Sequence, residues 1–189
     1  MMLGGFPTSP TAPLENKTPL SIEQAGDSVR AYLTRLGNRN LALAEVMAFD
    51  NHFYASVKEQ DSGLYAFELL IDRFNGQVVF EPGPNMMWNT KYGHMKMDML
   101  NRFFGVGSVD SQMTLSANEA QKTAQQFLEN VLPGTAARKV DRFYGYYTFH
   151  ILRKEKPIGM LSVNGQSGQV WVHSWHGEFL EMRSVDNVE

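Results

Sequence analysis

The sequence predicts an α+β protein built from two repeats of one unit, each a single helix packed on an antiparallel sheet of three or four strands. The main observation is a strand, turn and strand motif that occurs at residues 66–80 and again at 159–172. In each copy an apolar run ends at Asp72 or Asn164. A turn that contains a glycine follows, and the next strand begins with Gln-Val, which is a typical hairpin signal. A similar helix start precedes both motifs. We therefore expect a duplicated architecture.

Each unit is predicted to begin with an amphipathic helix. A serine supplies the N-cap, and a glutamine or glutamate three residues later completes a capping box. Apolar residues then recur at three- and four-residue spacing along one face. Glycine-containing pairs, at residues 37–38 and 133–134, end the two helices. The capping pairs are Ser21 with Gln24 and Ser116 with Glu119.

Strands follow each helix. In the first unit the pattern predicts strands over residues 41–50, 52–59, 64–72 and 77–80, because apolar and polar residues alternate there. The second unit keeps the same order. Its apolar positions match those of the first unit pair by pair: Val140 and Phe143 with Val46 and Phe49, then Tyr147, Phe149 and Ile151 with Phe53, Ala55 and Val57.

The repeat divides the chain into five segments. Residues 1–19 contain four prolines and form a flexible tether, of the kind that often follows a removed leader or a membrane anchor before residue 1. Residues 20–82 and 114–182 are the two repeats. Residues 83–113 form a methionine-rich connector, and residues 183–189 an acidic tail.

Composition excludes several classes of function. The net charge is -3, and the 17 Lys and Arg residues are scattered, so the chain has no electrostatic footprint for nucleic acid. No apolar run is long enough to span a membrane. Because the sequence has no cysteine, it offers no disulfide, thiolate nucleophile or thiolate metal ligand.

These motifs resemble the PepSY domain family, and the fold that we expect is cystatin/PepSY-like. The resemblance rests on Leu-Ser-x-x-x-Ala opening each helix and on the closing hairpins. These run from Ile71-Asp72 to Gly76-Gln77-Val78 and from Val163-Asn164 to Gly168-Gln169-Val170, and the likeness covers about two thirds of the chain. Asn164 departs from the usual Asp.

The resemblance implies a bacterial, periplasmic or otherwise extracytoplasmic module that recognises a protein or peptide and regulates peptidases in some relatives. It implies no catalysis. The sequence agrees, since none of its histidines comes with a recognisable nucleophile, orienting carboxylate or Gly-rich phosphate loop. We therefore expect a non-enzymatic binding or regulatory module.

The connector offers an alternative function. His94, Met95, Met97 and Met99 place thioethers at every second residue beside an imidazole. Thioethers select Cu(I), so this spacing predicts a site for binding or buffering cuprous ion. Methionine is also a common core filler and is favoured at adaptable binding surfaces, so packing and a partner-binding loop remain open.

A partner surface is the other candidate site. We expect large side chains of the connector and the sheets to contact the partner: Met86, Met87, Trp88, Tyr92, Tyr146, Trp171 and Trp175. Because strands alternate, the consecutive pair Tyr146-Tyr147 should leave one ring outside its own core, where it either packs the repeats together or faces a partner.

The sequence contains four further histidines, which are also candidate metal ligands. A metal shared by His173 and His176 requires a turn near Gly177, so an exposed aromatic and imidazole edge is the favoured interpretation. His52 and His150 occupy similar places on the predicted second strands, which indicates sheet-face positions rather than ligands.

Overall fold

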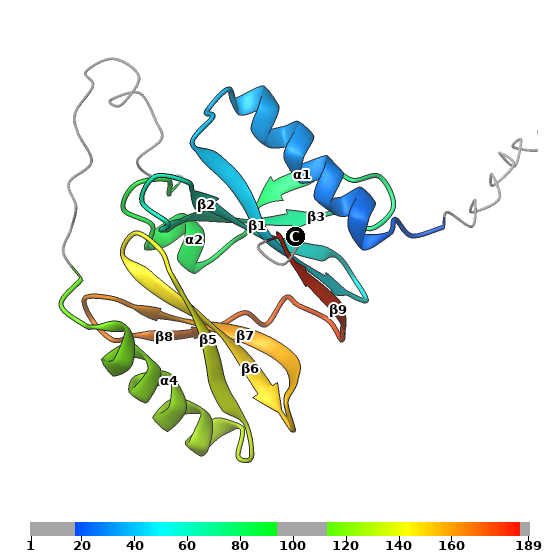
Figure 1. Ribbon diagram of the computed structural model, residues 1–189. Helices are drawn as coiled ribbons and strands as arrows, with labels where there is room; N and C mark the ends of the chain where they lie inside the picture. Colours follow the sequence, from blue (N-terminus) through cyan, green and yellow to red (C-terminus); the bar gives the residue numbers. More distant parts are fainter. Residues whose placement is uncertain (1–17, 94–112, 186–189) are drawn as a thin grey trace, which may run out of the picture.

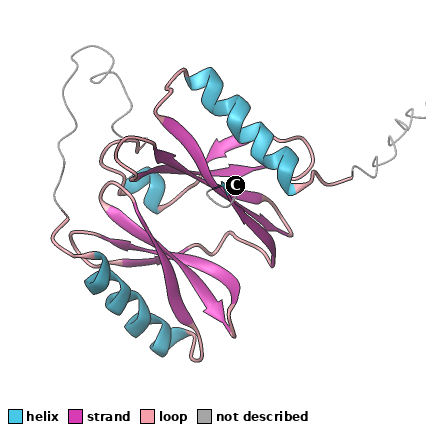
Figure 2. Ribbon diagram, viewed as in Figure 1, coloured by secondary structure: helices cyan, strands magenta, loops and turns pink. Residues whose placement is uncertain are grey.

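The computed structural model describes residues 18–93 and 113–185, and it has four layers, with a helix on each outer side and two antiparallel sheets between them (Figures 1 and 2). The predicted α+β class is confirmed. The first sheet has the order β4-β3-β2-β1-β9, and the second has the order β5-β6-β7-β8. Within the described part of the chain, no helix is long and apolar enough to cross a membrane.

The bounds of the elements follow the predicted pattern closely. The first unit contains α1 (Ile22–Leu36), β1 (Leu41–Phe49), β2 (Phe53–Glu59), β3 (Tyr65–Ile71), β4 (Val78–Phe80) and the short helix α2 (Pro84–Met87). The second unit contains α4 (Ala117–Val131), β5 (Ala136–Arg142), β6 (Tyr146–Arg153), β7 (Lys156–Asn164), β8 (Val170–Val172) and β9 (Phe179–Ser184).

Both helices begin as predicted. Ser21 and Ser116 are the N-caps, and each forms a complete capping box with the residue three positions later. Helix α1 covers the outer face of the first sheet with buried apolar residues such as Val29, and α4 covers the second sheet with residues such as Leu128 (Figure 1). The duplication itself stays a prediction from the sequence.

The two closing hairpins have equivalent turns despite their different first residues. The side-chain oxygen of Asp72 accepts hydrogen bonds from Phe74 N and Asn75 N at 2.8 and 2.9 Å. The amide oxygen of Asn164 accepts two bonds in the same way, at 3.0 and 2.9 Å. Asn164 therefore satisfies this turn as well as an aspartate does, because the turn needs an acceptor and not a charge.

The last strand corrects two predictions. After β8 the chain leaves the second sheet, and β9 pairs antiparallel with β1 in the first sheet (Figure 1). The first sheet therefore has five strands rather than the expected three or four. Arg183 and Ser184, assigned to an acidic tail, belong to β9, whose partner in a distant part of the chain is invisible to a local pattern.

Candidate metal centre

The layer between the two sheets combines an apolar cluster of Met47, Phe49, Tyr54 and Met160 with many buried polar groups, unlike the two apolar layers beneath the helices. Inward-facing positions of the strands and the residues that follow them carry carboxyl, imidazole and hydroxyl groups. Burying such groups is costly unless each is paired. The buried ionisable residues here are Glu45, Glu68, Glu81, Asp141, His150 and His173.

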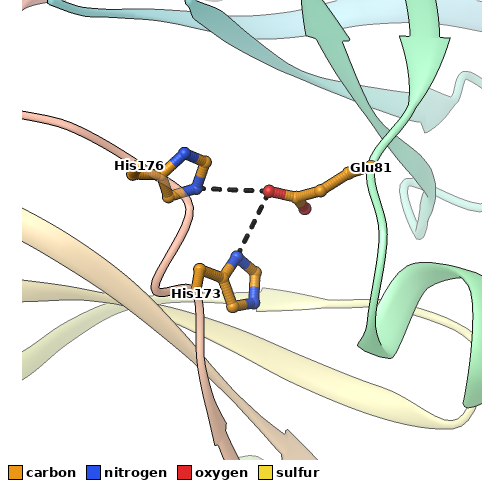
Figure 3. A group of neighbouring side chains, drawn as sticks. All are labelled: Glu81, His173 and His176. Carbon is orange, nitrogen blue, oxygen red and sulfur yellow. Dashed lines mark ion pairs between the residues drawn. The ribbon is translucent and has the colours of Figure 1, made fainter. Parts of the chain in front are cut away.

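Glu81, His173 and His176 come together in this layer (Figure 3). Glu81 follows β4, and its backbone N–H donates to Glu68 O in the neighbouring strand at 3.0 Å. His173 follows β8, and a turn brings His176 round to the same side. His173 Nδ1 lies 3.3 Å and His176 Nε2 lies 3.2 Å from Glu81 Oε1. Two imidazoles therefore face one carboxylate oxygen.

These short distances are not hydrogen bonds. His173 Nδ1, His176 Nε2 and Glu81 Oε2 are all buried, and none has a hydrogen-bond partner. Glu81 Oε1 accepts one bond, from the indole N–H of Trp175 at 2.9 Å. The cluster therefore holds buried polar atoms that face one another without satisfying one another, which is unusual in a folded protein.

The distances match the edges of a metal coordination shell. A zinc ion with tetrahedral bonds of about 2.0 to 2.1 Å holds neighbouring ligand atoms about 3.3 Å apart. The two nitrogens lie at 3.3 and 3.2 Å from Glu81 Oε1, and all three ligand atoms lie within 4.8 Å of one another. Two imidazoles and a carboxylate are a common ligand set for zinc.

The outer nitrogen of each imidazole is held by the protein. His173 Nε2 lies 2.9 Å from Ser162 Oγ, which is 2.8 Å from Thr148 Oγ1. His176 Nδ1 lies 2.7 Å from His52 Nε2. Metal-binding histidines usually have such a partner on the other ring nitrogen, because it fixes the orientation of the ring.

The hydroxyl chain from His173 ends on Glu68. This carboxylate accepts hydrogen bonds from Thr148 at 3.1 Å, from Tyr54 at 2.9 Å and from Tyr146 at 2.8 Å. Burial raises the pKa of Glu68 well above its usual range, and the charge of the neighbouring Glu81 raises it further, although the hydroxyl donors oppose both effects.

The neighbouring groups shift the other pKa values. Burial alone would raise the pKa of Glu81, but the facing His173 and His176 outweigh it and hold that pKa below its usual value. Burial lowers the pKa of His176, and it lowers that of His52 to about 4. The lowered pKa values of His52 and His176 favour the neutral form of each imidazole, which is the form that binds a metal.

A second cluster in the same layer contains Glu45, Asp141 and His150. His150 Nε2 lies 3.2 Å from Glu45 Oε1, again without a hydrogen bond. The other oxygen of Glu45 pairs with the ammonium group of Lys139 and accepts a bond from Ser184 at 3.3 Å. Burial raises the pKa of Asp141 to about 6. This cluster therefore contains a permanent cation of its own.

The predicted sites have different outcomes. His94, Met95, Met97 and Met99 lie outside the described residues, so the Cu(I) site stays a prediction. Tyr146 was predicted to face a partner, but its side chain is fully buried and bonded to Glu68. The partner role is wrong for this residue, and the structure shows the other predicted arrangement, in which the ring packs between the two units, because α4 covers β6 on one side and the first sheet covers it on the other (Figure 2).

Of the remaining residues predicted for the partner surface, Trp88 and Trp171 are in contact. The rings of Trp88 and Trp171 form a T-shaped pair with centroids 5.8 Å apart, and Met87 beside them is 60% exposed. Met86 and Trp175 are half-buried. Tyr92 is also half-buried and donates its hydroxyl to Glu59.

Sequence reasoning missed Glu81. It stands alone after a short apolar strand, and nothing in its neighbourhood marks it as a ligand. His173 and His176 were weighed as a shared site only if the chain turned near Gly177. The chain does turn there, with His176 N directed at His173 O at 3.5 Å, so the two imidazoles share one side. The favoured interpretation as an exposed edge is wrong, since both side chains are buried.

Comparisons with known proteins do not identify a family. No protein-family model matches the chain, and no curated protein matches its sequence. Among solved structures, the Bacillus megaterium YpeB C-terminal domain matches with a TM-score of 0.29 and 12% sequence identity. The match covers 82% of this chain and 62% of that one. At this TM-score the likeness carries no argument about function.

Proposed function

We propose that this protein is a non-enzymatic binding module that holds a divalent transition-metal ion, zinc by preference, between its two sheets. The ligands are Glu81, His173 and His176. The observation that carries the proposal is that two buried imidazole nitrogens lie 3.2 and 3.3 Å from one carboxylate oxygen without a hydrogen bond to it. A cation between them satisfies all three groups at once.

The hydroxyl chain supports this assignment. In the arrangement that we propose, His173 donates from Nε2 to Ser162, Ser162 donates to Thr148, and Thr148 donates to Glu68. The Nδ1 lone pair of His173 then faces the carboxylate of Glu81 at 3.3 Å. Two electron-rich atoms at this distance repel in a buried site, and a metal ion between them replaces the repulsion with two bonds.

The charge of the site points to a cation as well. Among the described residues, the basic groups within 4.0 Å of Glu81 are the two histidines, and neither a lysine nor an arginine pairs with it. A buried carboxylate without a permanent cation is costly. The ligand set is nitrogen and oxygen with no sulfur, which favours zinc over Cu(I).

A metal here would connect the two sheets. Glu81 extends from β4 of the first sheet, whereas His173 follows β8 of the second sheet, and His176 lies where the chain crosses to β9 (Figure 3). We propose that occupancy of the site controls how firmly the units are held together, and through this the recognition of a protein or peptide. The PepSY resemblance supports an extracytoplasmic location for such a module.

The test is a titration of the purified, metal-stripped protein with Zn²⁺, and with Co²⁺ as a spectroscopic probe. We expect one equivalent to bind with at least micromolar affinity and to give the strong visible absorption of tetrahedral Co²⁺. The Glu81→Gln variant should lose this binding. Glu59→Gln is the matched control, because Glu59 is also a buried carboxylate but already pairs with Lys91 at 2.5 Å. Retention of full affinity in Glu81→Gln would rule the site out.

A Cu(I) site in the connector is the second candidate function, and it rests on the spacing of His94, Met95, Met97 and Met99. It is tested by an anaerobic Cu(I) competition titration with the Met95→Leu, Met97→Leu and Met99→Leu triple variant. Loss of Cu(I) binding with Zn²⁺ binding retained would assign two separate sites. Unchanged Cu(I) affinity in the triple variant would exclude the connector as a copper site.

A further inference from the structure

The ligands of the proposed zinc site are closed off from solvent. The side chains of Glu81 and His173 are 0% exposed, and that of His176 is 1% exposed. An ion therefore reaches them only where a neighbouring group gives way. The neighbours of His173 on its outer side are the buried hydroxyls of Ser162 and Thr148, which lead into the core.

His52, the neighbour of His176, lies next to the surface, unlike the buried hydroxyls beside His173. Its Nε2 lies 2.7 Å from His176 Nδ1, so it is in direct contact with the ligand set. It is half-buried, and on its other side it lines a hollow in the surface beside Asn51, Asp72 and Gln77. His52 therefore touches both the cluster and this surface hollow.

We propose that this hollow is the route by which the metal ion enters and leaves, with His52 as its first binding group. This inference rests on the proposed zinc site. An imidazole is a good ligand for a divalent transition metal, and the ion needs to displace only the hydrogen bond between His52 and His176. Only the imidazole of His176 separates His52 from Glu81, because its Nδ1 contacts His52 and its Nε2 faces Glu81.

The charge at the mouth of the hollow favours a cation. Asp72 lines it, and one oxygen of this carboxylate is occupied by the backbone N–H groups of its own turn. The remaining charge attracts divalent cations, which raises their local concentration and the association rate. No lysine or arginine lines the hollow.

Rate measurements distinguish an access group from a group that only supports a ligand. A residue that acts only by binding the ion on its way in changes the association and dissociation rates by the same factor and leaves the affinity unchanged, since it is not a ligand in the final complex. A residue that only orients His176 changes the affinity, mainly through the dissociation rate. The two roles therefore give different results in one experiment.

The experiment is stopped-flow association of Zn²⁺ with the full chain, together with release of Zn²⁺ to excess EDTA. The variant is His52→Gln, which keeps a side-chain amide for the bond to His176 but is a much weaker ligand. We expect both rates to fall about tenfold with less than a twofold change in affinity. Unchanged rates, or a change confined to release, would overturn the proposal.

Asp72→Asn tests the mouth of the hollow without disturbing its turn, because Asn164 already forms the equivalent turn in the second unit. Here we expect a two- to threefold slower association at low ionic strength, and no difference from the native protein at high salt. Equal slowing at both salt concentrations would count against a steering role. If the native chain binds no Zn²⁺, the proposed function itself fails, whereas binding with rates insensitive to His52 removes only the access route.

Discussion

The two ionisable clusters between the sheets differ in whether a lysine takes part. Each contains a buried carboxylate with an imidazole nitrogen 3.2 to 3.3 Å away and no hydrogen bond between them. Glu45 also pairs with Lys139, whereas the ion pairs of Glu81 among the described residues are with histidines. Lys139 of the chain itself therefore neutralises the charge of Glu45. In our proposal a bound metal ion neutralises the charge of Glu81.

The position of Lys139 shows how such balance is built into a strand. It lies at an irregularity in the pairing of β5 with β6, and its φ of 48° is in the left-handed region that non-glycine residues seldom adopt. The bulge allows this lysine to reach Glu45 in the neighbouring unit. In this cluster the permanent cation comes from a local departure from regular backbone, whereas the two histidines of the other cluster come from a turn.

The largest expected effect separates the two clusters by their response to metal. In the native protein, Zn²⁺ should raise the free energy of unfolding, because it binds only the folded state. Glu81→Gln should lower Zn²⁺ affinity at least a thousandfold, about 4 kcal/mol, while Asp141→Asn leaves it unchanged. Urea unfolding with and without Zn²⁺ measures both. Equal losses in the two variants would contradict the comparison.

The next largest effect is expected from removing the charge of Lys139, the permanent cation that pairs with Glu45. Lys139→Met leaves the Glu45 carboxylate buried without a permanent partner, and we expect a loss of about 3 kcal/mol in the free energy of unfolding. Part of this loss should return with Zn²⁺, since the cluster then resembles that of Glu81. The measurement is urea unfolding in EDTA and in Zn²⁺.

Lys91→Met is the matched control for that variant. Lys91 and Lys139 have similar side-chain exposure, 32% and 34%, and each pairs with a buried glutamate. Glu59, the partner of Lys91, also accepts hydroxyl bonds from Tyr92 and Tyr144. The control should therefore lose less free energy of unfolding than Lys139→Met, and Zn²⁺ should stabilise it only as much as it stabilises the native protein. A larger loss for Lys91→Met would show that the hydroxyl donors do not compensate Glu59.

Asp141 should make stability depend on pH. Burial raises its pKa from 3.8 to about 6, with the charges around it, Lys139, Glu45 and His150, having smaller effects. The folded state therefore holds its proton more tightly than the unfolded state. Its contribution is fully present below pH 4 and is lost as pH rises through 6, by at most about 3 kcal/mol.

The Asp141→Asn variant isolates this contribution, since the asparagine does not ionise. The difference in free energy of unfolding between native protein and variant should shift between pH 4 and pH 7, in favour of the variant at the higher pH. Urea unfolding at a series of pH values measures it. Parallel stability curves for the two proteins would show that Asp141 ionises normally.

The smallest expected effect comes from the hydroxyl behind His173. Ser162→Ala removes the group that holds His173 Nε2, and we expect Zn²⁺ affinity to fall about tenfold, or about 1.4 kcal/mol. Ser56→Ala is the matched control, because Ser56 is equally buried but its hydroxyl has no hydrogen-bond partner. Isothermal titration measures both. Equal losses of affinity would mean that general packing, and not the bond to His173, is responsible.

Local features of the fold could be predicted from the sequence, because their signals lie within a few residues. The capping boxes at Ser21 and Ser116 and the turns at Asp72 and Asn164 are of this kind. The alternation of apolar residues correctly located the strands of the first sheet that precede the connector, but it did not predict β9. It also led to an error at Tyr146, since alternation shows which side a residue faces but not what covers that side.

The candidate metal centre could not be predicted for the same reason. Glu81 belongs to the first unit, and His173 and His176 belong to the end of the second, so their meeting depends on how the two sheets stack. A turn of three residues decides whether the histidines share one side. The sequence shows the ligand types but not the contact between units that brings them together.

The late strand β9 has a consequence for synthesis on the ribosome. The first unit emerges early, but the edge of β1 stays uncovered until the end of the second unit has been translated and β9 can pair with it. An uncovered strand edge is a template for pairing with other chains. The nascent protein therefore exposes an aggregation-prone edge while the second unit is being translated, and a chaperone that shields it would raise the yield of native chains.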